Sequence, residues 1–90
     1  MRESQIEAAF KNRIKALGGK TRKVAWIGVD GAPDRLALLP GRHVLVELKR
    51  PGEKPRIRQL REHETLRAAG FVVLVIDSLE LIDFYFPLRG

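Results

Sequence analysis

The strongest constraint on the fold is the run Phe71-Val72-Val73-Leu74-Val75-Ile76, in which every residue is apolar. A strand with one face in water alternates apolar and polar residues, and this run shows no such alternation. We therefore expect a strand that is covered on both faces, which requires a sheet with helices packed against it.

The rest of the chain contains patterns for those helices. Three are expected, over residues 4–17, 56–69 and 78–82. The first has apolar residues at helical spacing and a capping box formed by Ser4 and Glu7, and Gly18-Gly19 ends it. Gly70 ends the second helix, and Ser78 is expected to cap the third.

Three further strands are expected, over residues 22–29, 35–39 and 43–50. Turn residues separate them at 30–33 and 40–41. A tight connection near Gly41 places Asp34 opposite Leu48 or Lys49, and so beside both Glu47 and Lys49. The order is αβββαβ(α), which predicts an α/β fold with a mixed sheet flanked by helices.

Composition limits the class of protein. Ninety residues predict a single domain over residues 1–90, and the absence of cysteine excludes disulfides and thiolate metal sites. Lys and Arg outnumber Asp and Glu by 17 to 11, and the net charge of +6 favours a polyanionic partner. No apolar run approaches the roughly 20 residues that cross a bilayer, and the polar N-terminus lacks a signal-peptide core. We expect a soluble cytoplasmic protein with no membrane partner.

Two short motifs carry the chemistry: Gly31-Ala32-Pro33-Asp34, and Glu47-Leu48-Lys49 on the predicted strand 43–50. Two carboxylates that hold a divalent metal, beside a lysine that handles a proton, suit phosphodiester hydrolysis. The plainer alternatives are a turn role for Asp34 and an ion pair of Lys49 with either acid on an open sheet face. An acid within Val-Leu-Val-Glu-Leu-Lys is costly unless it has a partner, which favours the site.

These residues resemble a known family. Glu7, the Gly31-x-Pro33-Asp34 loop, Glu47-x-Lys49 followed by Arg50-Pro51, and Gln59 are together similar to the VRR-NUC nucleases of the PD-(D/E)XK superfamily. The resemblance extends from Ser4 to about Ile82 and implies the restriction-endonuclease-like αβββαβ core.

The resemblance also implies roles for these residues. Asp34 and Glu47 would hold Mg²⁺ or Mn²⁺, the carbonyl of Leu48 would add a ligand, and Glu7 would reach the metal directly or through water. Ligand sets made only of oxygen suit such hard cations.

Two further side chains would act around the metal. By the same resemblance, Lys49 would orient or deprotonate the attacking water or balance charge on the phosphate, and Gln59 would fix the geometry of the site. For Glu7 the alternative is the capping box alone, and for Gln59 an ordinary exposed helical position.

Family members that consist of this domain alone look like homodimers whose paired subunits act on branched DNA, including four-way (Holliday) junctions. This implies a structure-selective DNA endonuclease that works as a homodimer. Two alternatives remain open: a basic nucleic-acid-binding module without catalysis, and an RNA-processing nuclease.

Basic residues in two groups are candidate phosphate contacts, which position a substrate without reading its sequence. They are Lys20, Arg22, Lys23, Arg50, Lys54, Arg56, Arg58 and Arg61. Their alternative is a solvated charged face. His63 is expected to be a packed core or interface residue, and Trp26 either a core residue or a platform for an unpaired base. The apolar tail 84–88 either completes the core or forms a dimer contact.

Overall fold

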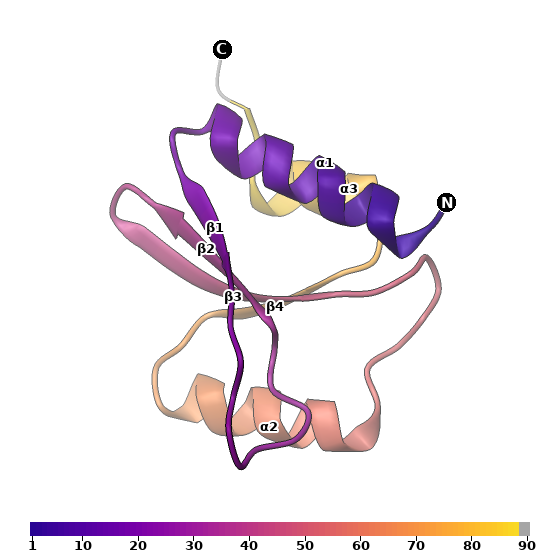
Figure 1. Cartoon of the computed structure of the whole chain (residues 1–90), viewed down its shortest axis with the longest axis vertical. Coiled ribbons are helices and arrows are strands. Elements are labelled where there is room, and N and C mark those ends of the chain that lie inside the picture. The colour runs from indigo at the N-terminus through magenta and orange to yellow at the C-terminus, as the bar shows by residue number, and fades with distance from the viewer. Residues whose placement is uncertain (89–90) are drawn as a thin grey trace.

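The computed structural model describes residues 1–88, which form three helices and one four-stranded sheet (Figure 1). In chain order the elements are α1 (Glu3–Ala16), β1 (Lys20–Lys23), β2 (Arg35–Leu39), β3 (Arg42–Leu48), α2 (Ile57–Ala68), β4 (Val73–Ile76) and α3 (Leu79–Tyr85). The predicted order αβββαβ(α) and the α/β class are confirmed. No helix within these residues combines the length and the apolar character needed to span a bilayer.

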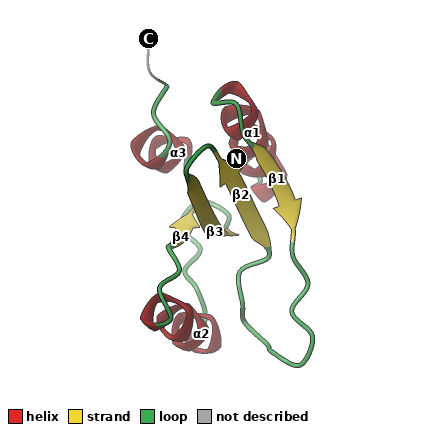
Figure 2. Cartoon of the chain, turned by 90° about the vertical axis from the view of Figure 1, so that its left-hand side faces the viewer, coloured by secondary structure: helices red, strands yellow, loops and turns green. Residues whose placement is uncertain are grey.

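The sheet is mixed, with strand order β1-β2-β3-β4. Antiparallel pairing joins β1 to β2 and β2 to β3, whereas β4 runs parallel to β3. A parallel neighbour requires a crossover, and α2 provides it. Figure 2 shows α2 on one side of the sheet and α1 with α3 on the other.

Helices α1 and α3 cover one face of the sheet and enclose the larger part of the core. Helix α1 buries Ile6, Phe10 and Ile14, which follow one another at four-residue spacing. Phe86 is 0% exposed and packs edge-on against Phe10, with ring centroids 6.0 Å apart. The tail therefore completes the core through Phe86, while Phe84 stays 74% exposed.

Helix α2 covers the other face through a smaller cluster, which we call the α2-face cluster: Leu45, Leu66 and Val73, with Leu36 and Trp26 packed against them. Trp26 is half-buried against this cluster, and its indole Nε1 donates a hydrogen bond to the carbonyl oxygen of Pro33 (2.7 Å). Because Ile76 belongs to the opposite cluster, β4 is covered on both faces as predicted. The strand is shorter than expected, and Phe71 and Val72 precede it half-exposed.

The predicted capping box of Ser4 and Glu7 is wrong. Helix α1 begins at Glu3 with Arg2 as its N-cap, and the Arg2 backbone N–H donates to Oε1 of Gln5 (2.6 Å). The helix starts before Ser4, so Glu7 lies in its second turn, too far along to cap its beginning. The predicted cap of α3 is confirmed, because Ser78 Oγ accepts from the N–H of Leu81, although α3 continues to Tyr85.

The predicted strand 22–29 is also wrong in its bounds. Strand β1 covers Lys20–Lys23, and the ladder continues only through the N–H of Val24, which donates to the carbonyl of Asp34 (2.9 Å). The chain after Val24 has no strand to pair with, because β2 begins only at Arg35 and Pro33 has no N–H that could donate a ladder hydrogen bond. Residues 25–29 therefore form a loop.

Candidate active site

Strand register brings the two acids and the lysine to one face of the sheet. The β2–β3 pairing ends with Arg35 opposite Val46, so Asp34 stands level with Glu47. The predicted partner of Asp34 was Leu48 or Lys49. The predicted register was wrong by one or two residues because the turn is centred between Pro40 and Gly41.

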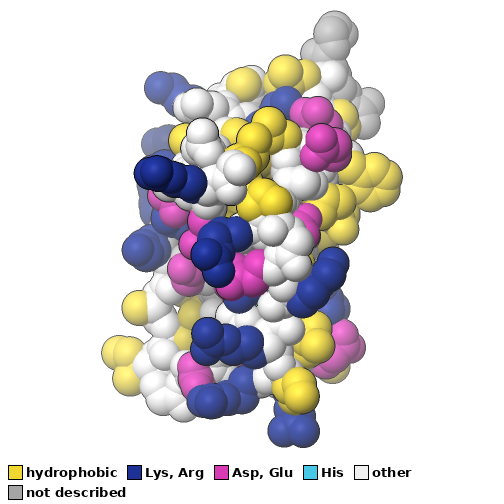
Figure 3. All heavy atoms as spheres, turned by 90° about the vertical axis from the view of Figure 1, so that its right-hand side faces the viewer, with side chains coloured by type: hydrophobic (Ala, Val, Ile, Leu, Met, Phe, Trp, Pro, Cys, Tyr) yellow, Lys and Arg dark blue, Asp and Glu magenta, His cyan; other side chains and the backbone are white. Residues whose placement is uncertain are grey.

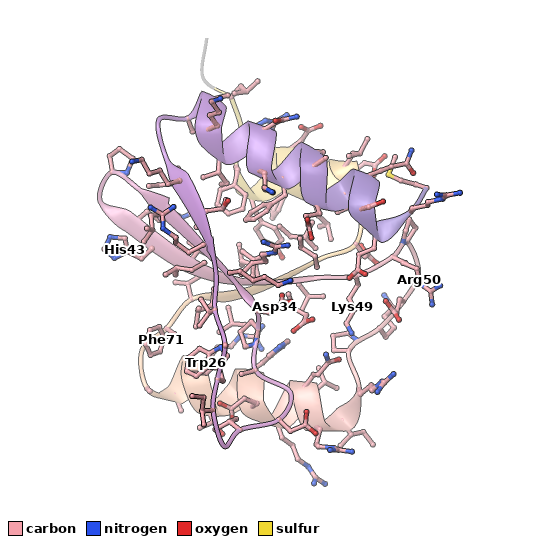
Figure 4. All side chains as sticks on the ribbon, in the orientation of Figure 1. Trp26, Asp34, His43, Lys49, Arg50 and Phe71 are labelled. Carbon is pink, nitrogen blue, oxygen red and sulfur yellow. The ribbon has the colours of Figure 1, made fainter. Side chains whose placement is uncertain are left out.

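The same face carries the α2-face cluster. Residues two apart on a strand share a face, and Leu36 and Leu45 both belong to that cluster. Asp34, Glu47 and Lys49 therefore face α2. Figure 4 shows Asp34 and Lys49 at the same end of the sheet, on the side toward α2.

Glu47 and Lys49 are buried, which weakens the plainer alternative of an ion pair on an open sheet face. Each is 8% exposed, and among residues 1–88 neither Glu47 nor Asp34 forms an ion pair with Lys49. Oε1 of Glu47 is buried without a hydrogen-bond partner. Such groups are rare in native structures and call for a functional explanation.

The raised pKa of Glu47 also indicates a functional role for this residue. Burial raises the pKa of this carboxyl to about 7, and the negative charges of Asp34, Glu3 and Glu53 add to the rise while Lys49 opposes it. A carboxylate that is desolvated and crowded by other acids is stabilised by a cation.

A cavity of about 300 Å³ opens beside these acids. Its walls come from the loop before β2, from β3 and from the start of α2: Asp30, Gly31, Ala32, Asp34, Glu47, Arg56, Arg58 and Gln59. Figure 3 shows acidic side chains in the middle of the face that carries the N-terminus of α1 and the β3–α2 loop, with Lys and Arg side chains around them. The arrangement suits an anionic ligand held near a cation.

Gly31 allows the loop that carries Asp34 to lie against α2. Its φ is +88°, and a Cβ at this position would stand 3.0 Å from the backbone carbonyl oxygen of Arg58. Only glycine adopts this conformation without strain and permits such an approach.

Gly31→Ala is expected to destabilise the fold by roughly 1–2 kcal/mol through backbone strain and to lower nuclease activity, because the loop must move away from α2. Gly28→Ala is the matched control, since Gly28 also has a positive φ but a Cβ added there would meet no atom within 4 Å. Urea unfolding and cleavage rates measure both effects. Equal loss of activity in both variants would contradict a specific role for the contact at Gly31.

The structure does not place every predicted residue in the cavity. The carboxylate of Glu7 forms an ion pair with Arg35 (2.5 Å). Arg35 is the first residue of β2 and directly follows Asp34, but its side chain points to the opposite face, toward α1. Gln59 lines the cavity, and its Oε1 accepts from the backbone N–H of Arg56 (2.9 Å) as part of the α2 cap. Their roles in metal binding and positioning stay predictions.

Three residues near Glu47 were not singled out for the site. Glu3 and Glu53 both raise the pKa of Glu47, and His63 lies 3.7 Å from its Oε1. No local pattern distinguishes Glu3 from Glu7, which is one helical turn away. His63 could have been found from its position one turn after Gln59.

The candidate phosphate contacts differ in their relation to the cavity. Arg56 and Arg58 line it, although Arg58 also forms an ion pair with Asp30. Arg50 pairs with Glu53 (3.7 Å) in the β3–α2 loop. The remaining members are exposed, and those on β1 stand outside the cavity: Lys20, Arg22 and Lys23.

The residues present fit a hard divalent cation. Within residues 1–88 no cluster of three or more His, Cys, Asp or Glu side chains could hold a metal by itself. Mg²⁺ usually keeps several waters and takes only one or two protein carboxylates, which matches Asp34 and Glu47. The burial of Glu47 beside a second acid supports this fit, because a desolvated carboxylate next to another negative charge is stabilised by a cation.

No family model matches the sequence. The chain is 45% identical over 82 residues to p44 of Acyrthosiphon pisum secondary endosymbiont phage 1, a protein named as a nuclease, and the match covers 90% of this chain and 88% of p44. A solved structure described as a VRR_NUC domain superposes with a TM-score of 0.86 at 39% identity, covering 98% of this chain and 97% of that one. With the order of elements, the paired acids and these relatives in agreement, the chain belongs to the VRR-NUC family of nucleases.

Proposed function

We propose that this nuclease is a metal-dependent endonuclease that hydrolyses phosphodiesters of branched DNA, including four-way junctions, as a homodimer. One observation carries the metal dependence: Asp34 and Glu47 stand level on one face, and Glu47 is buried, with its pKa raised to about 7 by desolvation and by the neighbouring acids. A cation between the two acids would relieve both their repulsion and the desolvation of Glu47.

Asp34, Glu47 and the backbone carbonyl of Leu48 would hold Mg²⁺ or Mn²⁺. The bound ion would lower the pKa of a water and offset the charge that builds up on the phosphate. Lys49 is in electrostatic range of Glu47 and could hold the phosphate or take a proton from the attacking water. Gln59 and Arg56 would fix the substrate at the cavity wall.

The choice of a polyanionic substrate is supported by the net charge of +6 and by the arginines around the cavity. The homodimer is supported by exposed apolar side chains on and after α3, where Phe84 and Leu88 face solvent. Such residues are common at interfaces between subunits.

A substrate panel tests the proposal. Linear duplex, flap, splayed-arm and four-way-junction DNA, with RNA of matching shapes, are incubated with Mg²⁺, with Mn²⁺ and with a chelator. We expect cleavage only with metal, and fastest on the four-way junction, because two symmetric sites suit two symmetric cuts. Retention of DNA without cleavage would indicate a binding module, and faster cleavage of RNA would indicate an RNA-processing nuclease.

Sedimentation of the free protein serves as the companion measurement for the dimer. A mass of one chain at every concentration used for cleavage would contradict paired subunits.

A further inference from the structure

His63 is a buried polar residue that the proposed chemistry does not yet use. It lies on α2, is 0% exposed, and within residues 1–88 neither Nδ1 nor Nε2 has a hydrogen-bond partner. Its Nε2 lies 3.7 Å from Oε1 of Glu47, which also has no hydrogen-bond partner. The two unpartnered groups therefore face each other across the α2 side of the sheet.

Packing alone does not explain a histidine at this position. One turn further along α2, Leu66 fills the same side of the helix with an apolar side chain. Leaving a buried polar group without a partner costs roughly 1–3 kcal/mol, whereas an apolar residue of similar size would avoid that cost. A buried histidine at this position is explained if its hydrogen bond forms when the protein binds metal.

Nε2 of His63 can donate a hydrogen bond in either charge state, because the charged imidazole has an N–H on both ring nitrogens. A neutral imidazole has one N–H donor and one acceptor nitrogen. With the proton on Nε2, the donor faces Glu47.

We propose that His63 is a positioning residue: its Nε2–H donates a hydrogen bond to Oε1 of Glu47, which fixes the carboxylate and leaves the other oxygen for the cation. The inference rests on the proposed metal dependence and deepens it. The gap of 3.7 Å closes to hydrogen-bond distance with a small shift of either side chain. Hydrogen bonds of this kind orient metal ligands and are worth about 10–100-fold in metal affinity.

The test compares His63→Leu, which removes the donor and fills the space, with His63→Gln, which keeps an N–H donor. Mn²⁺ binding to the metal-free protein is measured by calorimetry, and thermal unfolding is measured without metal. For His63→Leu we expect a Kd for Mn²⁺ about 10–100-fold higher together with an unchanged or higher melting temperature. His63→Gln should recover most of the affinity.

A structural role would give a different pattern, in which His63→Leu lowers the melting temperature and His63→Gln rescues nothing. Unchanged Mn²⁺ affinity in His63→Leu would overturn the inference and leave the proposed function standing. A wild-type protein that neither binds Mn²⁺ nor needs metal for cleavage would overturn both. If His63→Leu does not fold, His63→Met replaces it, since methionine matches glutamine in length and lacks the donor.

Discussion

Asp34→Asn is expected to lower the rate of metal-dependent cleavage by roughly 10³-fold, because it weakens several kcal/mol of charge stabilisation at the phosphate. The fold should be retained, since Asp34 is exposed and its charge only adds to the repulsion at Glu47. Single-turnover cleavage of a four-way junction with saturating Mg²⁺ measures the rate, and urea unfolding measures stability.

Glu64→Gln is the control for this loss of charge. Glu64 lies on the exposed side of α2, pairs only with Arg67 among residues 1–88, and is outside the cavity wall. Its variant should cut at close to the parent rate. Lys49→Met, which keeps the length of the side chain but removes the ammonium, should match the loss seen in Asp34→Asn. An Asp34→Asn protein that cuts as fast as the parent would refute the assignment of Asp34 to the metal.

Glu47→Gln is expected to abolish metal-dependent cleavage and, without metal, to change how stability depends on pH. The pKa of Glu47 is about 7 in the folded chain against 4.5 as its ordinary value. Well below pH 4.5 the carboxyl is protonated in both the folded and the unfolded states. As the pH rises to 7, only the unfolded state ionises fully, so the free energy of unfolding falls.

The size of this effect follows from the shift in pKa. It corresponds to a loss of about 3 kcal/mol between pH 4.5 and pH 8 in the metal-free parent. Glu47→Gln should lack this loss, and Glu64→Gln should keep it. Adding Mg²⁺ at pH 8 should stabilise the parent but not Glu47→Gln, because the cation binds the ionised form. Parallel stability curves for the parent and Glu47→Gln would show that Glu47 is not desolvated as described.

Much of the site could be recognised in the sequence. The acid within the apolar strand segment, the Gly-x-Pro-Asp loop and the lysine two residues after Glu47 are local patterns. Asp34 and Glu47 line the cavity, whereas Lys49 is not part of its wall. The structure keeps Asp34, Glu47 and Lys49 on one face even though the predicted register was wrong by one or two residues. The β3 alternation and the position of Asp34 before β2 were enough for this result.

Other parts of the site could not be predicted in this way. Glu7 was predicted to reach the metal directly or through water, and this role stays a prediction; the structure shows its carboxylate bound to Arg35 on the opposite face of the sheet. Arg35 and Asp34 are neighbours in sequence and point to opposite faces, so their partners depend on which helix covers which face. That arrangement is decided by packing over the whole chain.

The amino-acid sequence by itself determined the order of the elements and the buried strand, because helix and strand periodicity and turn residues act over a few positions. It also singled out Asp34, Glu47 and Lys49 as candidates for the site. Only the tertiary structure decided that His63 faces Glu47, that the charge of Glu3 acts on Glu47, and that Phe86 enters the core. These contacts join residues far apart in the chain, and they form only when the strands pair in register and the helices cover the two faces of the sheet.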